Sequence, residues 1–251
     1  MKIAAFACVA SLSVFAQSVT VPMDLQGNVP IVELEIAKAS GGMRNVRFVV
    51  DSGGGGFIVG SKVMADIGAK REGPVQEAEG ERFQLLSGVR AYARGMELNL
   101  AGVNTVGFAE KEWILQRNDA EGLIPGKLLR KYHMIFDYPQ RTLTFAKFGS
   151  VEPRGEKIKA DIAPNNGFPR IEVEVGGQAY GVLLDTGASF TMISRVKIDE
   201  WLKANPTWRT ATGATAFANT RAMYTPTYGY PSFPRICGRT STFCGRTDPT
   251  P

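Results

Sequence analysis

The chain has 251 residues, of which 44% are hydrophobic, and its 29 Lys and Arg against 24 Asp and Glu give a formal net charge of +5. This length and apolar content allow one large or two small domains with a substantial core. The basic residues are spread out without a Lys/Arg run or an aromatic-basic stripe, so we expect no nucleic-acid-binding face.

Residues 1–16 have the pattern of a secretory signal peptide. Lys2 precedes an apolar run that begins at Ile3, and Val14 and Ala16 occupy the small-residue positions of a cleavage site. We therefore expect an exported protein, periplasmic or extracellular after cleavage; the alternative is a buried first helix. No later segment approaches the roughly 20 apolar residues of a transmembrane helix, so we expect no membrane span.

The first unit, residues 29–148, contains two strand patterns, and the second of them ends at a carboxylate. Residues 31–36 alternate apolar and polar side chains, which is typical of a strand with one wet face. Residues 48–50 form an apolar triplet, followed by Asp51-Ser52-Gly53. This pattern predicts a buried strand that ends at Asp51 in a tight turn.

Four glycines, Gly53 to Gly56, raise the alternative of a phosphate-binding loop. The pair Ser61-Lys62 reverses the order that such a loop needs to place its Lys on a phosphate.

The rest of the unit shows short strand patterns broken by glycines between residues 75 and 106, which predicts antiparallel hairpins. We interpret His133, the only His of the chain, as a surface or hydrogen-bonded side chain. Because the chain has a single His, the usual sets of His and Cys metal ligands cannot be assembled.

Residues 149–167 are rich in Pro, Gly, Lys and Asn, and we interpret them as a linker. The second unit, residues 168–225, repeats the first pattern: residues 171–175 alternate, and the apolar residues 182–184 lead into Asp185-Thr186-Gly187-Ala188-Ser189. Residues 198–204 predict a short helix that ends near Pro206. Two carboxylates behind two similar strands predict one shared site.

Residues 226–251 have little periodicity, so we expect an irregular tail there. Cys237 and Cys244 lie in this tail, and the sequence leaves open whether they pair. The second unit is much shorter than the first after its Asp and has no counterpart of the segment 121–132, so we expect its lobe to be incomplete.

At these motifs the sequence resembles the retropepsin-like aspartic peptidases. Residues 185–189 match that family's D-[TS]-G-[AS]-[ST] signature throughout, and residues 51–53 match its first three positions. Gly54 and Gly55 depart from it. Segment 121–132 and the hairpin pattern after it resemble the family's closing turn, helix and hairpin, with Pro125 where a second Gly would align.

The resemblance implies an all-β fold of two tandem acid-protease barrels and an intramolecular catalytic pair, Asp51 and Asp185, without a cofactor or metal. Ser52, Gly53, Thr186, Gly187 and Ser189 would support the pair. It also implies a peptide or protein substrate, a flap formed by a hairpin between Gln76 and Tyr92, and a monomer that mimics a dimer.

Two alternatives stay open. The chain can be a non-catalytic exported β module that binds peptides or envelope components, as Gly54, Gly55 and the short second lobe suggest. Alternatively, Asp185 units from two chains can pair in a homodimer, as in the family's single-domain members.

Overall fold

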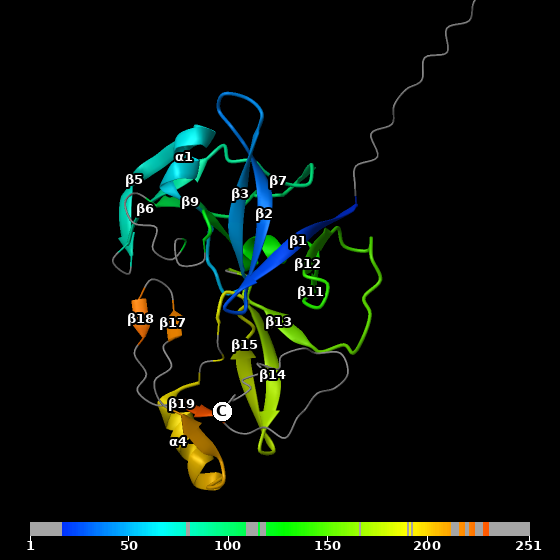
Figure 1. The fold of residues 1–251 in the computed structure, drawn as a ribbon, viewed down its shortest axis with the longest axis vertical. Coiled ribbons are helices and arrows are strands. Elements are labelled where there is room, and N and C mark those ends of the chain that lie inside the picture. Colours follow the sequence, from blue (N-terminus) through cyan, green and yellow to red (C-terminus); the bar gives the residue numbers. More distant parts are fainter. Residues whose placement is uncertain are drawn as a thin grey trace, which may run out of the picture.

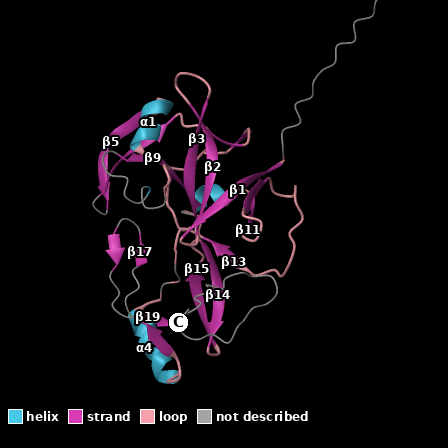
Figure 2. Ribbon diagram, in the orientation of Figure 1, coloured by secondary structure: helices cyan, strands magenta, loops and turns pink. Residues whose placement is uncertain are grey.

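The computed structural model describes residues 17–78, 81–108, 115, 119–165, 167–189, 191, 193–211, 216–218, 221–223 and 228–230 (Figure 1). Strands make up most of this structure, with helices α1 (Ser61–Ile67), α3 (Gly126–Leu129) and α4 (Arg195–Ala204) beside them (Figure 2). The expected all-β class is confirmed. None of the helices in the described residues is long and apolar enough to cross a membrane. The expected signal peptide lies outside the described residues.

Twelve strands form one large mixed sheet, in the order β11-β12-β1-β2-β3-β10-β4-β9-β6-β5, with β7 and β8 attached through β2. The strands are β1 (Ser18–Gln26), β2 (Val29–Ala37), β3 (Met43–Asp51), β4 (Phe57–Val59), β5 (Lys70–Ala78), β6 (Glu81–Ser87), β7 (Ala91–Ala93), β8 (Met96–Glu97), β9 (Thr105–Phe108), β10 (Gly122–Pro125), β11 (His133–Asp137) and β12 (Thr142–Ala146).

Strand β1 joins two parts of this sheet. Its first half, Ser18–Pro22, pairs with β12, and its second half, Met23–Gln26, pairs with β2. Its inward-facing side chains Val21 and Met23 are buried in the main core, together with Leu34, Phe48 and other residues of β2 and β3. The alternation that buries one face of a strand therefore begins before residue 29, where we placed the start of the first unit.

Strand β10 lies between β3 and β4 and fixes the end of β3. It runs parallel to β3, with Gly122 opposite Phe48 and Pro125 opposite Asp51. A side chain at Gly122 would collide with the Phe48 ring, because a Cβ there would lie 2.2 Å from Cε1 of Phe48. Glycine thus allows β10 to lie beside β3 next to the buried Phe48 ring. The pairing with β10 fixes the last four residues of β3.

Strands β5 and β6 form a hairpin at the far edge of the sheet. They pair from Lys70 with Ser87 to Ala78 with Glu81, and the register shifts between Glu72 and Gln76. The hairpin that we expected between Gln76 and Tyr92 is therefore longer on its first strand and ends at Ser87. Its role as a flap stays a prediction.

A second sheet of three strands follows the large one: β13 (Ala160–Ile162), β14 (Pro169–Val175) and β15 (Gln178–Leu183), in that order (Figure 1). The indole of Trp201 on α4 is mostly buried and donates a hydrogen bond to the Tyr180 hydroxyl of β15 (2.8 Å), which anchors the helix to the strand. The helix begins three residues earlier than we expected, because Ser194 caps it by accepting a hydrogen bond from the N–H of Lys197 (3.4 Å).

Short strand pairs complete the described structure: β16 (Arg209–Ala211) with β19 (Tyr228–Tyr230), and β17 (Ala216–Ala218) with β18 (Arg221–Met223). Strand β13 lies inside the segment that we interpreted as a linker. Strand β19 lies inside the expected irregular tail; residues 226–227 and 231–251, with Cys237 and Cys244, are outside the described residues.

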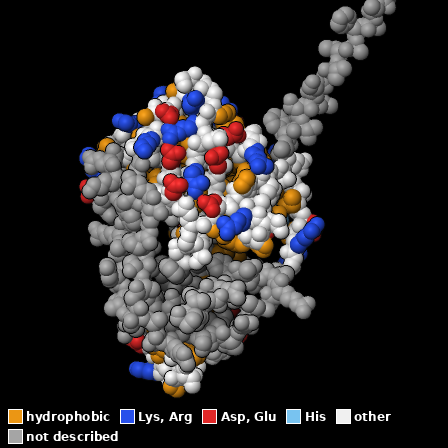
Figure 3. Space-filling model, viewed as in Figure 1, with side chains coloured by type: hydrophobic (Ala, Val, Ile, Leu, Met, Phe, Trp, Pro, Cys, Tyr) orange, Lys and Arg blue, Asp and Glu red, His pale blue; other side chains and the backbone are white. Residues whose placement is uncertain are grey.

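The surface of the large sheet over β1–β3 carries side chains of both charge signs, interspersed with one another (Figure 3). Arg44 forms ion pairs with Asp66 and Glu121, and Arg47 forms one with Asp24 (3.3 Å). A surface with both charge signs is typical of a solvated face, whereas a charged polymer is attracted by a surface of one sign.

Candidate active site

Asp51 stands at the end of β3, where the loop that follows folds back onto its carboxylate. The N–H of Gly53 donates to Oδ1 of Asp51 (2.9 Å), and the N–H of Gly54 donates to the Asp51 backbone oxygen (3.1 Å). The preceding Val50 is fully buried. The carboxylate is thus fixed at the end of a rigid strand by its own turn.

Asp185 follows β15 with the same local pattern. The N–H of Gly187 donates to Oδ1 of Asp185 (2.9 Å), and the N–H of Ala188 donates to the Asp185 backbone oxygen (3.4 Å). Equal hydrogen bonds at the same positions show that the two motifs form the same turn, once in each unit.

Ser52 and Thr186 join the two turns. The N–H of Ser52 donates to Oγ1 of Thr186 (3.0 Å), and the N–H of Thr186 donates to Oγ of Ser52 (3.0 Å). Each hydroxyl in turn donates across: Ser52 to the Leu184 oxygen (2.6 Å), and Thr186 to the Val50 oxygen (2.7 Å). These hydroxyls therefore bind the opposite turn.

The glycines of the two motifs leave room for the opposite carboxylate. A Cβ at Gly53 would lie 2.7 Å from Cγ of Asp185, and a Cβ at Gly187 would lie 2.5 Å from Cγ of Asp51. Both distances are too short for any side chain larger than hydrogen. Each carboxylate therefore packs against the glycine of the other motif, which brings Asp51 and Asp185 into contact.

This contact changes the acidity of Asp51. Burial, the nearby Asp185 charge and a hydrogen bond with the Asp185 side chain raise the pKa of Asp51 to about 8, against the opposing N–H groups of Gly53 and Gly54. Two carboxyl groups in contact repel each other when both are ionised, which favours a state in which the pair holds one proton. Such a pair offers an acid and a base side by side at neutral pH.

The structure explains one of the two departures from the repeated signature. A Cβ at Gly54 would lie 2.8 Å from Cδ2 of Leu123 on β10 and 2.9 Å from Oδ2 of Asp51, so this turn has no space for the side chain that Ala188 carries in the other. A Cβ at Gly55 would meet nothing within 4 Å. Nothing in the structure explains why Gly55 stands where the other motif has Ser189.

The two turns differ in how the strand residues that precede their aspartates are packed. Before Asp51, Val49 and Val50 are 4% and 0% exposed, and β10 lies along them. Before Asp185, Leu183 and Leu184 are 47% and 44% exposed. Among the described strands only β14 pairs with β15, so no counterpart of β10 is present there.

Two further groups contact the site, and our sequence analysis did not single them out. The Nδ2 of Asn28 donates to the Ser189 backbone oxygen (3.2 Å), from the turn between β1 and β2. Gly126, at the start of α3, packs against Ser52, since a Cβ there would lie 2.4 Å from the Ser52 oxygen and 3.1 Å from the Gly167 oxygen. The dipeptide Gly27-Asn28 between two alternating segments is a hairpin signal that the sequence offered.

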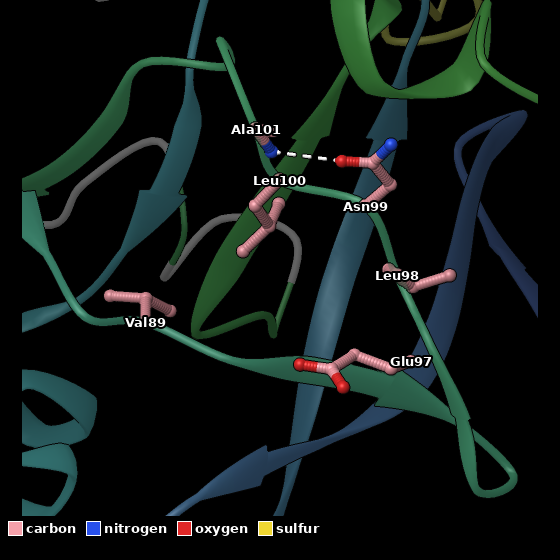
Figure 4. A pocket seen from close by; sticks show the side chains of 6 residues that line it. All are labelled: Val89, Glu97, Leu98, Asn99, Leu100 and Ala101. Atoms are coloured by element: carbon pink, nitrogen blue, oxygen red, sulfur yellow. Dashed lines mark hydrogen bonds between the residues drawn. The ribbon is translucent and has the colours of Figure 1, made fainter.

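A hollow of about 470 Å³ lies on the first unit (Figure 4). It is lined by Val89, Glu97, Leu98, Asn99, Leu100 and Ala101, and by no residue of either motif. The side-chain oxygen of Asn99 accepts a hydrogen bond from the Ala101 N–H (3.1 Å). His133 lies on β11, also outside the paired turns, and the described residues contain no cluster of three or more potential metal ligands.

No protein-family model and no curated protein matches the chain. Among solved structures, the chain is similar to a retropepsin-like aspartic protease from Rickettsia conorii, with 12% sequence identity and a TM-score of 0.34, over 52% of this chain and 90% of that one.

Proposed function

We propose that this protein is an aspartic-type endopeptidase that hydrolyses peptide bonds with a water molecule activated between Asp51 and Asp185. The observation that carries the proposal is the contact between the two carboxylates, each packed on the glycine of the other motif. Neither motif alone would be informative, because an Asp in a turn after a strand commonly just accepts backbone hydrogen bonds. Burial and mutual repulsion give this pair the shared proton that acid-base hydrolysis needs.

In this proposal the two carboxyl groups act as one pair that holds a single proton. The protonated carboxyl group of the pair donates a hydrogen bond to the substrate carbonyl oxygen, while the other carboxylate accepts a proton from the water. The water oxygen forms a bond to the carbonyl carbon, and the tetrahedral intermediate breaks when its C–N bond cleaves and the leaving amine takes a proton from the pair. No covalent bond to the protein forms, and no cofactor or metal takes part.

The substrate would be an extended peptide or protein segment. Main-chain hydrogen bonds to strand edges would supply affinity, and alternate side chains would enter pockets on either side of the aspartates. The hairpins β5–β6 and β17–β18, both at the left of the molecule in Figure 1, are the segments that we propose as flaps. Since one chain carries both motifs, we propose that it acts as a monomer, exported to the periplasm or the cell exterior.

A second candidate is a non-catalytic module of the same fold that binds peptides without cleaving them. The exposure of Leu183 and Leu184 favours it, because the strand that leads to Asp185 is less well packed than β3. A loosely held carboxylate would still permit peptide binding, while catalysis needs both groups fixed within a fraction of an ångström.

Cleavage of a random peptide library, read by mass spectrometry from pH 3 to 8, tests the proposal. The wild type should cut, and Asp51→Asn and Asp185→Asn should each be inactive while they still bind peptide. If only Asp185→Asn is inactive, the active pair forms between two chains. If the folded wild type binds peptide and cuts nothing at any pH, the binding module replaces the peptidase.

A further inference from the structure

The turn between β1 and β2 reaches from the first unit to the second motif. Gly27 and Asn28 form a two-residue turn with φ of 55° and 70°, the backbone pattern of a tight hairpin turn of type I′. Asn28 Nδ2 donates to the Ser189 backbone oxygen (3.2 Å), and a Cβ at Gly27 would lie 3.5 Å from Oγ of Ser189. The hairpin tip thus contacts the end of the turn that carries Asp185.

This hairpin is a firm support. Strand β1 is paired along its whole length, with β12 over its first half and with β2 over its second. Met23 and Val29, on either side of the turn, are each 2% exposed. Asp24 is held by the Arg47 guanidinium (3.3 Å), which also bonds the Asp119 oxygen (2.8 Å). A turn set between such anchored strands moves little, so a group that it holds is held in place.

The turn after Asp185 needs such support from outside. In the first motif, β10 pairs with the four residues that end at Asp51. In the second motif, the described structure has no such strand, and Leu183 and Leu184 are half exposed. The second unit holds this turn through its own N–H groups and through the Leu184 N–H, which donates to the Pro169 oxygen of β14 (2.9 Å). Further contacts come from the first unit: Ser52 on one side of the turn and Asn28 on the other.

We infer that Asn28 is a positioning residue for Asp185, which it holds through the Ser189 backbone oxygen. Its amide N–H supports the outer end of the turn, opposite the Ser52–Thr186 hydrogen bonds at the inner end. The contact stands on the geometry alone, whereas its consequence for catalysis rests on the proposed peptidase function. Asn also fits the turn itself, because it tolerates the positive φ that this position requires.

The test replaces the amide without straining the turn. Asn28→Gly keeps the positive φ and removes the donor, and Asn28→Asp keeps the shape but replaces the donor by an acceptor. Arg94→Gly is the matched control, because Arg94 and Gly95 form a two-residue turn with φ of 43° and 80° between β7 and β8. That hairpin pairs with β2 at Glu35 and Ile36, at the opposite end of β2 from Asn28.

Two readouts are compared: kcat and KM for a library-derived peptide, and the titration of Asp51 and Asp185 followed by carboxyl ¹³C NMR. Loss of one neutral hydrogen bond that orients the dyad should lower kcat about three- to tenfold with KM near the wild-type value. The titration of the dyad should also move in Asn28→Gly and Asn28→Asp, and both readouts should stay at wild-type values in Arg94→Gly.

Unchanged kcat and unchanged titration in both Asn28 variants would overturn the inference, as would an equal change in Arg94→Gly. If the wild type cleaves no peptide, the proposed function fails, and the NMR titration alone decides: a shift confined to the Asn28 variants supports the positioning role, and identical titrations refute it.

Discussion

Ser52 and Thr186 exchange hydrogen bonds across the site: the backbone N–H of each donates to the hydroxyl of the other, at 3.0 Å in both directions. Each hydroxyl then donates to the backbone oxygen that precedes the opposite aspartate, at Leu184 and Val50. Four bonds thus tie the two turns together, and the geometry of the carboxylates depends on them.

Removal of the Thr186 hydroxyl should destabilise the protein. Thr186→Val leaves the Ser52 N–H and the Val50 oxygen without their partner, at a cost of about 2 kcal/mol in the free energy of unfolding. Thr186→Ser keeps the hydroxyl and should stay near the wild type. Urea denaturation measures both, with Thr20→Val as the control, since the Thr20 hydroxyl bonds the Thr144 hydroxyl at the exposed face of β1 (2.7 Å). An equal loss in Thr20→Val would contradict the special role of the cross-turn bonds.

An added methyl group at Gly187 should separate the carboxylates. In Gly187→Ala the new Cβ would meet Asp51 at 2.5 Å, so one turn must shift, which costs about 1–3 kcal/mol and at least tenfold in kcat. Gly55→Ala is the matched control in the other turn, because a Cβ there meets nothing within 4 Å. Kinetics on a peptide substrate check both; full activity of Gly187→Ala would show that the turns do not pack as described.

The buried proton of Asp51 should make stability fall as pH rises. The unfolded chain loses this proton near the ordinary pKa of 3.8, whereas the folded chain keeps it until about pH 8. Between these values the folded state holds more protons, so the free energy of unfolding falls by at most about 1.4 kcal/mol per pH unit as pH increases. Asp51→Asn should flatten this slope and be more stable than the wild type near pH 8.

The control for this pH dependence is Asp24→Asn. The hydrogen bond from Arg47 and that from the Leu25 N–H lower the pKa of Asp24, so Asp24 titrates below this window. Its variant should keep the wild-type slope from pH 5 to 8 in denaturation monitored by tryptophan fluorescence. A wild-type slope in Asp51→Asn would mean that Asp51 is ionised in the folded protein.

Arg130 should hold the loop between β13 and β14 of the second sheet against the first unit. Its Nη1 donates to the backbone oxygens of Ala163 (3.2 Å) and Pro164 (2.7 Å). Arg130→Met keeps most of the side-chain volume and removes both bonds, so it should cost about 1–3 kcal/mol and speed hydrogen exchange at the backbone amides of Ala163 and Gly167. Arg154→Met, at an exposed site between β12 and β13, should leave exchange unchanged. Acceleration in that variant alone would refute the role of Arg130.

Much of the fold was predictable from local pattern. The alternating residues of β2 and β14, the apolar triplet before Asp51 and the helix before Pro206 all produced the expected element type. The period-2 pattern of β1 was equally visible, with Val19, Val21 and Met23 on one face. We did not use it, since we placed the start of the unit at residue 29.

The site was predictable only in part. The repeated Asp-hydroxyl-Gly pattern indicated that two carboxylates could share one site, but the partners of Ser52 and Thr186 depend on how two distant turns pack. The same holds for Gly54, whose missing side chain is explained by Leu123 of β10, far away in sequence. Asn28 carried a turn signal, and nothing in its local pattern indicated a contact with Ser189. The catalytic roles of Asp51 and Asp185 stay predictions.

Carboxyl ¹³C NMR titration of Asp51 in the wild type and in Asp185→Asn tests most directly whether the two motifs form one site. The account predicts that Asp51 titrates near pH 8 in the wild type and at a lower pH in Asp185→Asn, because the neighbouring charge is gone while the burial remains. Identical titration of Asp51 in both proteins, near its ordinary pKa, would show that the carboxylates do not meet and would contradict the shared site.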